Sequence, residues 1–457
     1  MQSPFPFDTL VLFGFLSTML LCGVAMRARI SGLQRFLFPS CLVGGTLGLL
    51  LMSSGILPIR ADDIQTFAYH CFNLSFISVG LTQDEKIAVK GRTRTVLRGS
   101  VWMALTQGVT FPLQALIGGV LVIAFGLGGM DLFPTFGFLA PLGFNEGPGQ
   151  ALSFGKVWQQ VGFEHGATVG LTFAAMGYFF AFFIGVPLVN RGLRKRNATG
   201  GVKALAGDVR TGLLKSSAVR QPAGQLTTHS SNIDTLAYQC AVVGLVYLVT
   251  YGLVAGIVRL LPADAGAMLW GFFFFFGLAV ALLVRKLMGI AGVAHLMDPG
   301  MQRRITGWSV DYLIVATVTG IQLAVVWAYW LPITAIGLTA GIVTTVVVLV
   351  LGRRLDNYRL ERTVAIYGTV TGTVSCGLLL LRMVDPQLKS PATMEIALMN
   401  IMVLPFVGGC TILVNGPVWW QWSVAMTVGV FLAVMGLSLV LMRIAGFSHR
   451  SCARDDA

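Results

Sequence analysis

About a dozen apolar stretches, most of them close to 20 residues long, follow one another along this 457-residue chain. A helix needs roughly 20 mostly apolar residues to cross the hydrocarbon core of a bilayer. Only 11% of the residues are charged, against about a quarter in soluble domains. The pattern therefore predicts an all-α polytopic membrane protein.

Apolar length predicts two sets of five transmembrane helices and one extra helix at the C-terminal end. The spans are 9–26, 36–56, 64–82, 100–127 and 166–190, then 235–260, 266–284, 308–328, 332–352 and 393–416, and finally 419–442. Two more segments, 133–156 and 363–384, are apolar at both ends and broken in the middle by glycine and polar residues. The flanks of the 133–156 break are about half a span long, so we predict that both segments are re-entrant hairpins.

The basic residues support this topology. With both hairpins re-entrant and the N-terminus outside, all but Arg60, Lys156 and Arg259 of the 32 Lys and Arg residues fall in cytoplasmic segments. Such a bias is typical of the positive-inside rule. The net charge of +13 therefore indicates topology, and we predict no nucleic-acid partner. The C-terminus is predicted to be cytoplasmic.

The order of elements predicts an inverted-topology repeat, because five helices with a hairpin before the fifth occur twice and start on opposite sides. The repeats cover 8–192 and 234–417, a cytoplasmic linker covers 193–233, and 418–457 holds the extra helix and a cytoplasmic tail. At an offset of 225 residues, Gly143 aligns with Gly368 and Gly147 with Gly372. Paired broken segments in inverted repeats indicate the binding site of a secondary transporter.

Three sequence stretches resemble the bacterial sodium/glutamate symporter family over roughly residues 8–417: FPSCLVGGTLGLLL, LSFISVGLTQDEK and ATVGLTFAAMGYFFAFFIGVPLVNRGLRK. The resemblance implies a Na⁺-coupled carrier of an acidic amino acid, a homodimer and an elevator-like mechanism. Both hairpin tips depart from the family pattern. The first reads GFNEGPGQ and the second YGTVTGTVSCG, where the family has glycine-rich tips, the first with a histidine and small polar residues. The final helix also lies beyond the family's usual end.

Glu146 is predicted to be the acidic residue near the bilayer centre, because Asp311 and Glu395 are expected within a turn of helix ends, where water solvates them. An intramembrane ionisable group is a functional candidate. Glu146 is therefore expected to bind a cation or carry a proton; the alternative is a structural role in the turn.

The other candidate residues are polar groups at the tips and in the third and tenth helices. Serine and threonine hydroxyls in membrane helices often bond nearby backbone instead of a ligand, and Arg382 either holds a substrate carboxylate or anchors the helix at the membrane surface. The predicted substrate contacts are Asn145, Glu146, Gln150, Ser153, Asn73, Ser75, Thr371, Thr373, Ser375 and Asn400. The predicted ion ligands are Gly143, Glu146, Gly147, Gly368, Thr369 and Gly372.

The sequence therefore predicts a secondary transporter in the bacterial inner membrane that carries a small carboxylate, such as glutamate, together with Na⁺. The seven cysteines have no metal-binding spacing, and P-loop, HExxH and GxGxxG motifs are missing, so we predict neither a cofactor nor an enzyme. Two alternatives stay open. One is an H⁺-coupled carrier of another solute that uses Glu146, and the other is a channel or a non-transporting membrane scaffold.

Overall fold

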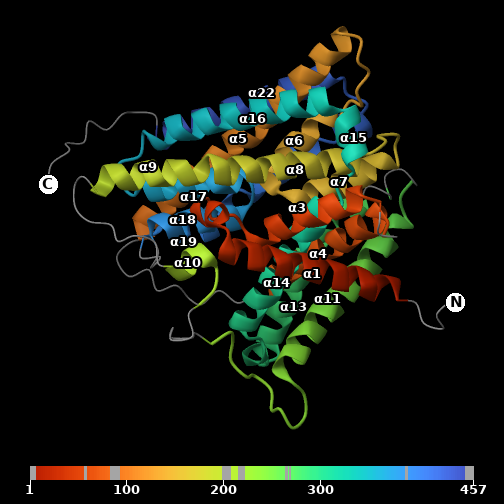
Figure 1. Cartoon of the computed structure of the whole chain (residues 1–457), viewed down its shortest axis with the longest axis vertical. Coiled ribbons are helices and arrows are strands. Elements are labelled where there is room, and N and C mark those ends of the chain that lie inside the picture. The colour runs from red at the N-terminus through yellow and green to blue at the C-terminus, as the bar shows by residue number, and fades with distance from the viewer. Residues whose placement is uncertain are drawn as a thin grey trace.

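The computed structural model describes residues 7–55, 59–82, 93–197, 207–214, 222–262, 266, 269–385 and 390–447 (Figure 1). Every regular element among these residues is a helix. Parts of the predicted linker (198–206 and 215–221) and of the predicted tail (448–457) lie outside the described residues.

The helices follow the predicted order. The first half contains α1 (Asp8–Arg29), α2 (Ser31–Arg35), α3 (Ser40–Ser53), α4 (Ala61–Leu81), α5 (Thr93–Leu127), α8 (Gly166–Phe183) and α9 (Gly185–Asn197). After α10 (Gly207–Thr211), the second half contains α11 (Thr235–Val258), α13 (Phe273–Ile290), α14 (Pro299–Thr319), α15 (Leu323–Ala328), α16 (Trp330–Gly352), α19 (Ala392–Met402), α20 (Gly409–Leu413), α21 (Gly416–Trp419) and α22 (Val424–Ile444).

Seven helical segments among the described residues are long and apolar enough to cross a membrane, which fits a multi-pass membrane protein. An eighth span results if α19 and α20, which meet at a 43° bend, are counted as one. The break falls at Val403, between α19 and the π-helical turn η5 (Leu404–Gly408) that precedes α20. Pro405 lies in the first turn of η5, and proline commonly kinks helices. Eleven spans were predicted. α3 has 14 residues, which reach only about 21 Å, and the polar side chains of α4 and α14 lower their hydropathy.

The bounds of α14 differ from the predicted span 308–328. Asp298 accepts a hydrogen bond from the backbone N–H of Met301 at 2.6 Å, and Pro299 occupies the first helical position. Both are strong signals for a helix start. Because α14 begins there, Asp311 lies in the middle of the helix and not within a turn of its end. That prediction for Asp311 was wrong.

Two helical hairpins stand where the broken segments were predicted. The first consists of η1 (Phe136–Phe138), α6 (Leu139–Pro141), η2 (Leu142–Glu146) and α7 (Pro148–Gln159), and the second of α17 (Arg359–Thr371) and α18 (Val374–Val384). The first hairpin packs on α8, and α17 and α18 pack on α9 (Figure 1). The backbone leaves the helical conformation only at Gly147 and at Gly372–Thr373. Thr369, Thr371 and Ser375 are therefore helical, and Thr373 lies in the break.

Candidate functional site at the hairpin tips

The two hairpin tips touch each other. A Cβ atom built on Gly147 would lie 2.6 Å from Thr373 Cγ2 and 3.3 Å from the carbonyl oxygen of Gly372. Gly147 also has a φ of +90°, which favours glycine. Gly147 and Gly372, which align in the sequence, each directly follow the last helical residue of the first arm of their hairpin. The contact requires a residue without a side chain at position 147.

A helix begins at each tip. α7 starts at Pro148 and α18 at Val374, and neither N-terminus has a side chain that caps its free N–H groups. The N-terminal end of a helix carries a partial positive charge and unpaired N–H donors. The meeting of the tips therefore places two uncapped helix N-termini close together, an arrangement suited to an anionic group.

Asn145 and Gln114 connect the tips to α5. The buried Asn145 donates hydrogen bonds to Thr110 Oγ1 at 3.1 Å and to Gln114 Oε1 at 3.4 Å. Gln114 donates in turn to the carbonyl oxygen of Val370, in the second hairpin, at 3.1 Å. Gln114 thus bonds to both hairpins. Sequence reasoning missed it, although Gln107, Thr110 and Gln114 follow the i, i+3, i+7 spacing of one helix face.

Glu146 is the last residue of the first arm and is half-buried. Its Oε2 accepts a hydrogen bond from Gln150 Nε2 at 2.7 Å. Among the described residues it has no Lys, Arg or His partner within ion-pair distance. An ionised carboxylate in such a place needs a compensating charge. The binding of a cation or a proton by Glu146 stays a prediction, as does the alternative of a structural role in the turn, for which the bond from Gln150 is available.

Several amide atoms near the tips have no hydrogen-bond partner among the residues that the structure describes. They are Asn145 Oδ1, Gln150 Oε1, and both Oδ1 and Nδ2 of Asn73, all of them buried. Asn73 lies on α4, where the preceding Phe72 contacts Gly149 of the first hairpin. Buried polar groups are nearly always paired, so these atoms are available to a ligand.

The predicted hydroxyls mostly bond to their own helices. Each of four hydroxyls donates a hydrogen bond of 2.7–2.9 Å to a backbone carbonyl earlier in its own helix. The donors are Ser75, Ser153, Thr369 and Thr371, and the acceptor lies four residues earlier, or three residues earlier for Ser75. Their hydrogens are therefore used by the helix backbone, which is the structural alternative. Thr373, at the break itself, donates to Cys376 Sγ at 3.7 Å.

The remaining predicted residues have other surroundings. Gly143 packs against the backbone of α8, and Gly368 packs against the backbone of α18. Ser375 and Asn400 are exposed, and the structure does not bring them into the tip contact. Arg382 is exposed as well, in keeping with a surface anchor. Asp311 is exposed too, and it lies beside Cys41 of α3.

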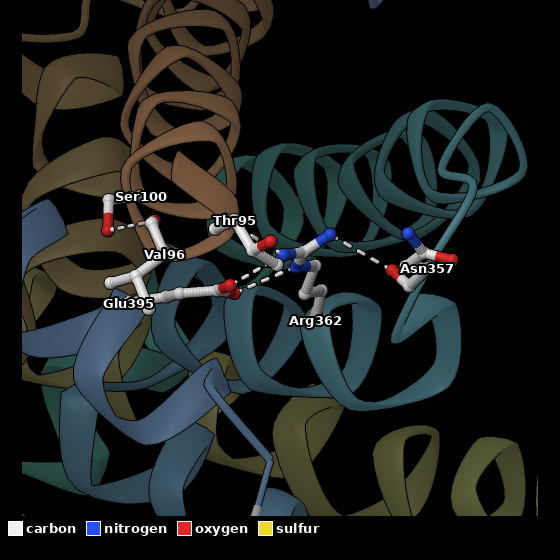
Figure 2. Close-up of polar contacts among 6 residues, drawn as sticks. All are labelled: Thr95, Val96, Ser100, Asn357, Arg362 and Glu395. Carbon is white, nitrogen blue, oxygen red and sulfur yellow. Dashed lines mark hydrogen bonds and ion pairs between the residues drawn. The ribbon is translucent and has the colours of Figure 1, made fainter. Parts of the chain in front are cut away.

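The prediction that water solvates Glu395 was wrong, because its side chain is fully buried. Figure 2 shows its carboxylate facing Arg362, whose Nε donates to Oε2 at 2.8 Å and whose Nη2 donates to Oε1 at 2.5 Å. Gly99 of α5 leaves the room for this carboxylate, since a Cβ there would overlap it. The pair joins the start of the second hairpin to α19 in the interior of the fold.

Comparisons with known proteins do not extend these observations. No family model, no curated protein and no solved structure matches this chain.

Proposed function

We propose that the chain is a secondary active transporter that carries a small carboxylate, such as an acidic amino acid like glutamate, together with Na⁺. The observation that carries the proposal is the contact between the two hairpin tips at Gly147 and Gly372–Thr373. Broken helices that meet at depth form the substrate and ion sites of many secondary transporters. A packed, purely structural core gives no reason for two uncapped helix N-termini at one contact.

Packing between the two halves supports an inverted repeat. α3 packs on α14, and its counterpart α13 packs on α4. α1 packs on α3 and α11 on α13, while α4 contacts α14 and α5 contacts α16. Each of these contacts is reproduced when the first set of helices is exchanged for the second, as a two-fold relation between repeats requires.

The chemistry of the tips supports a carboxylate and a cation as ligands. The N-termini of α7 and α18 offer N–H donors to a substrate carboxylate. Glu146, with the unpaired oxygens of Asn145 and Gln150, offers the hard oxygen ligands that small cations prefer. A cation on Glu146 also removes the repulsion between its carboxylate and an anionic substrate, which gives a physical reason for coupling the two.

We further propose that the protein is a homodimer in the bacterial inner membrane, with the N-terminus outside and the C-terminus in the cytoplasm. An elevator-like step would carry the hairpins across the membrane relative to a fixed scaffold. The distribution of Lys and Arg residues supports the orientation.

Uptake into proteoliposomes tests the function. We expect labelled glutamate to accumulate under an inward Na⁺ gradient without a pH gradient. Accumulation that needs only a pH gradient would identify H⁺, and not Na⁺, as the coupling ion. The H⁺ alternative rests on the same carboxylate, because Glu146 has no basic partner among the described residues. If none of the carboxylates tested accumulates under a gradient, the result would favour a channel or a non-transporting scaffold.

A further inference from the structure

A cavity of about 190 Å³ lies away from the hairpin tips, at the opposite end of α17. The first turns of α5, the turn between α16 and α17, and Phe447 after α22 form its walls. The arginine residues in these walls are Arg94, Arg98, Arg354 and Arg362. The sequence interpretation used them only to assign this side of the molecule to the cytoplasm.

Positive charge exceeds negative charge around this arginine cavity. Arg362 pairs with Glu395, and Arg98 lies 3.7 Å from Asp356 and over the ring of Phe447. The guanidinium groups of Arg94 and Arg354 have no ion pair and no hydrogen bond within the described part of the chain. Among the described residues, four arginines therefore face two carboxylates, and two guanidinium groups have no partner.

One wall of the cavity is fixed in place. Besides its two bonds to Glu395, Arg362 donates from Nη1 to the carbonyl oxygen of Asn357 at 3.0 Å and from Nη2 to that of Thr95 at 3.2 Å (Figure 2). These bonds use four of its five N–H groups. The buried Arg362 thus holds α5 and the start of α17 together, while Arg94 and Arg354 are exposed and able to close on a ligand.

We propose that this cavity binds a phosphate group, supplied either by the headgroup of an anionic phospholipid or by a soluble phosphate. The planar guanidinium fork matches phosphate oxygens and forms charge-assisted hydrogen bonds with them. The surplus of two positive charges favours a group that carries one or two negative charges. Basic pockets between transmembrane helices on the cytoplasmic side recognise such headgroups.

The test compares ligands and variants in detergent solution. Purified protein is titrated with phosphatidylglycerol, with phosphatidylcholine and with inorganic phosphate, and binding is followed by native mass spectrometry and thermal unfolding. The variant Arg94→Gln/Arg354→Gln removes the two free guanidinium groups. The matched control Arg353→Gln/Arg359→Gln removes the same charge from exposed neighbours that do not line the cavity.

We expect the Arg94→Gln/Arg354→Gln variant to raise the Kd for its phosphate ligand by about tenfold or more, with the control close to wild type. Binding of phosphatidylglycerol without binding of inorganic phosphate would identify a lipid, and binding of both would identify a site for soluble phosphate. Three results would overturn the proposal. They are an equal loss of affinity in the two variants, equal affinity for phosphatidylcholine and phosphatidylglycerol without binding of inorganic phosphate, and no binding by wild type. The side chains of the four substituted arginines have no hydrogen bond or ion pair with other described residues, so both variants should remain monodisperse.

Discussion

The buried pair between Arg362 and Glu395 allows a quantitative prediction. The exposed fractions of the two side chains are 6% and 0%, and two hydrogen bonds join them. Glu395→Gln keeps the shape of the side chain and removes its charge, which leaves the guanidinium of Arg362 buried without a counter-charge. Breaking a buried ion pair on one side costs about 3–5 kcal/mol, and we expect the free energy of unfolding to fall by that amount.

Chemical unfolding in one detergent measures this change, and Asp356→Asn is the matched control. The ion pair of Asp356 with Arg98 is longer, at 3.7 Å, and the side chains are 36% and 55% exposed. Exposed pairs contribute about 0–1 kcal/mol. Replacing both buried partners by methionine should recover much of the loss, because no charge is then left unpaired. An effect of Glu395→Gln no larger than that of Asp356→Asn would refute this reasoning.

Three further changes have defined outcomes. Gly147→Ala should abolish transport, because its Cβ would press on the second tip. Gly429→Ala is the control and should leave transport intact, because there is open space around Gly429. Equal transport activity of the two variants would contradict the role of the tip contact. Gln114→Leu should lower the free energy of unfolding by about 1–3 kcal/mol, measured by chemical unfolding, because it removes hydrogen bonds to both hairpins. Lys156 lowers the pKa of Asp62 through a 2.6 Å hydrogen bond, so Asp62→Asn should lower the free energy of unfolding at pH 7 by less than about 1 kcal/mol, measured by chemical unfolding. That stabilisation is present above the unfolded pKa of Asp62, about 3.9, and is lost as the pH falls through the lower folded pKa. A difference in stability between wild type and Asp62→Asn that persists in strong acid would show that the ion pair is not its cause.

The sequence predicted the positions of both hairpins well. Local signals were sufficient there, because a glycine that can adopt a positive φ, followed by a proline suited to a first helical position, marks a break between two helices. Gly147, followed by Pro148 at a first helical position, is such a signal. The alignment of Gly147 with Gly372 also matches the structure, since each directly follows the first arm of its hairpin.

The errors concern properties that depend on distant residues or on a neglected local signal. Glu395 is buried because Arg362, 33 residues earlier, faces it in the fold, and no local pattern reveals that partner. Gln114 hydrogen-bonds to Val370, 256 positions away. The start of α14 could have been predicted from the sequence, since Asp298 and Pro299 form a recognisable helix start. The span 308–328 was assigned by apolar length alone, which placed Asp311 near a helix end instead of in the middle of the helix.

Glu146 at the meeting hairpin tips is proposed to couple a cation to a carboxylate substrate. Glutamate accumulation in proteoliposomes under a Na⁺ gradient, measured for wild type, Glu146→Gln and Glu164→Gln, tests this coupling. Glu164 is an exposed carboxylate in the turn after α7 and serves as the control for the charge change. We expect wild type and Glu164→Gln to accumulate glutamate and Glu146→Gln to lose its response to Na⁺. Na⁺-driven accumulation by Glu146→Gln at the wild-type rate would contradict the account.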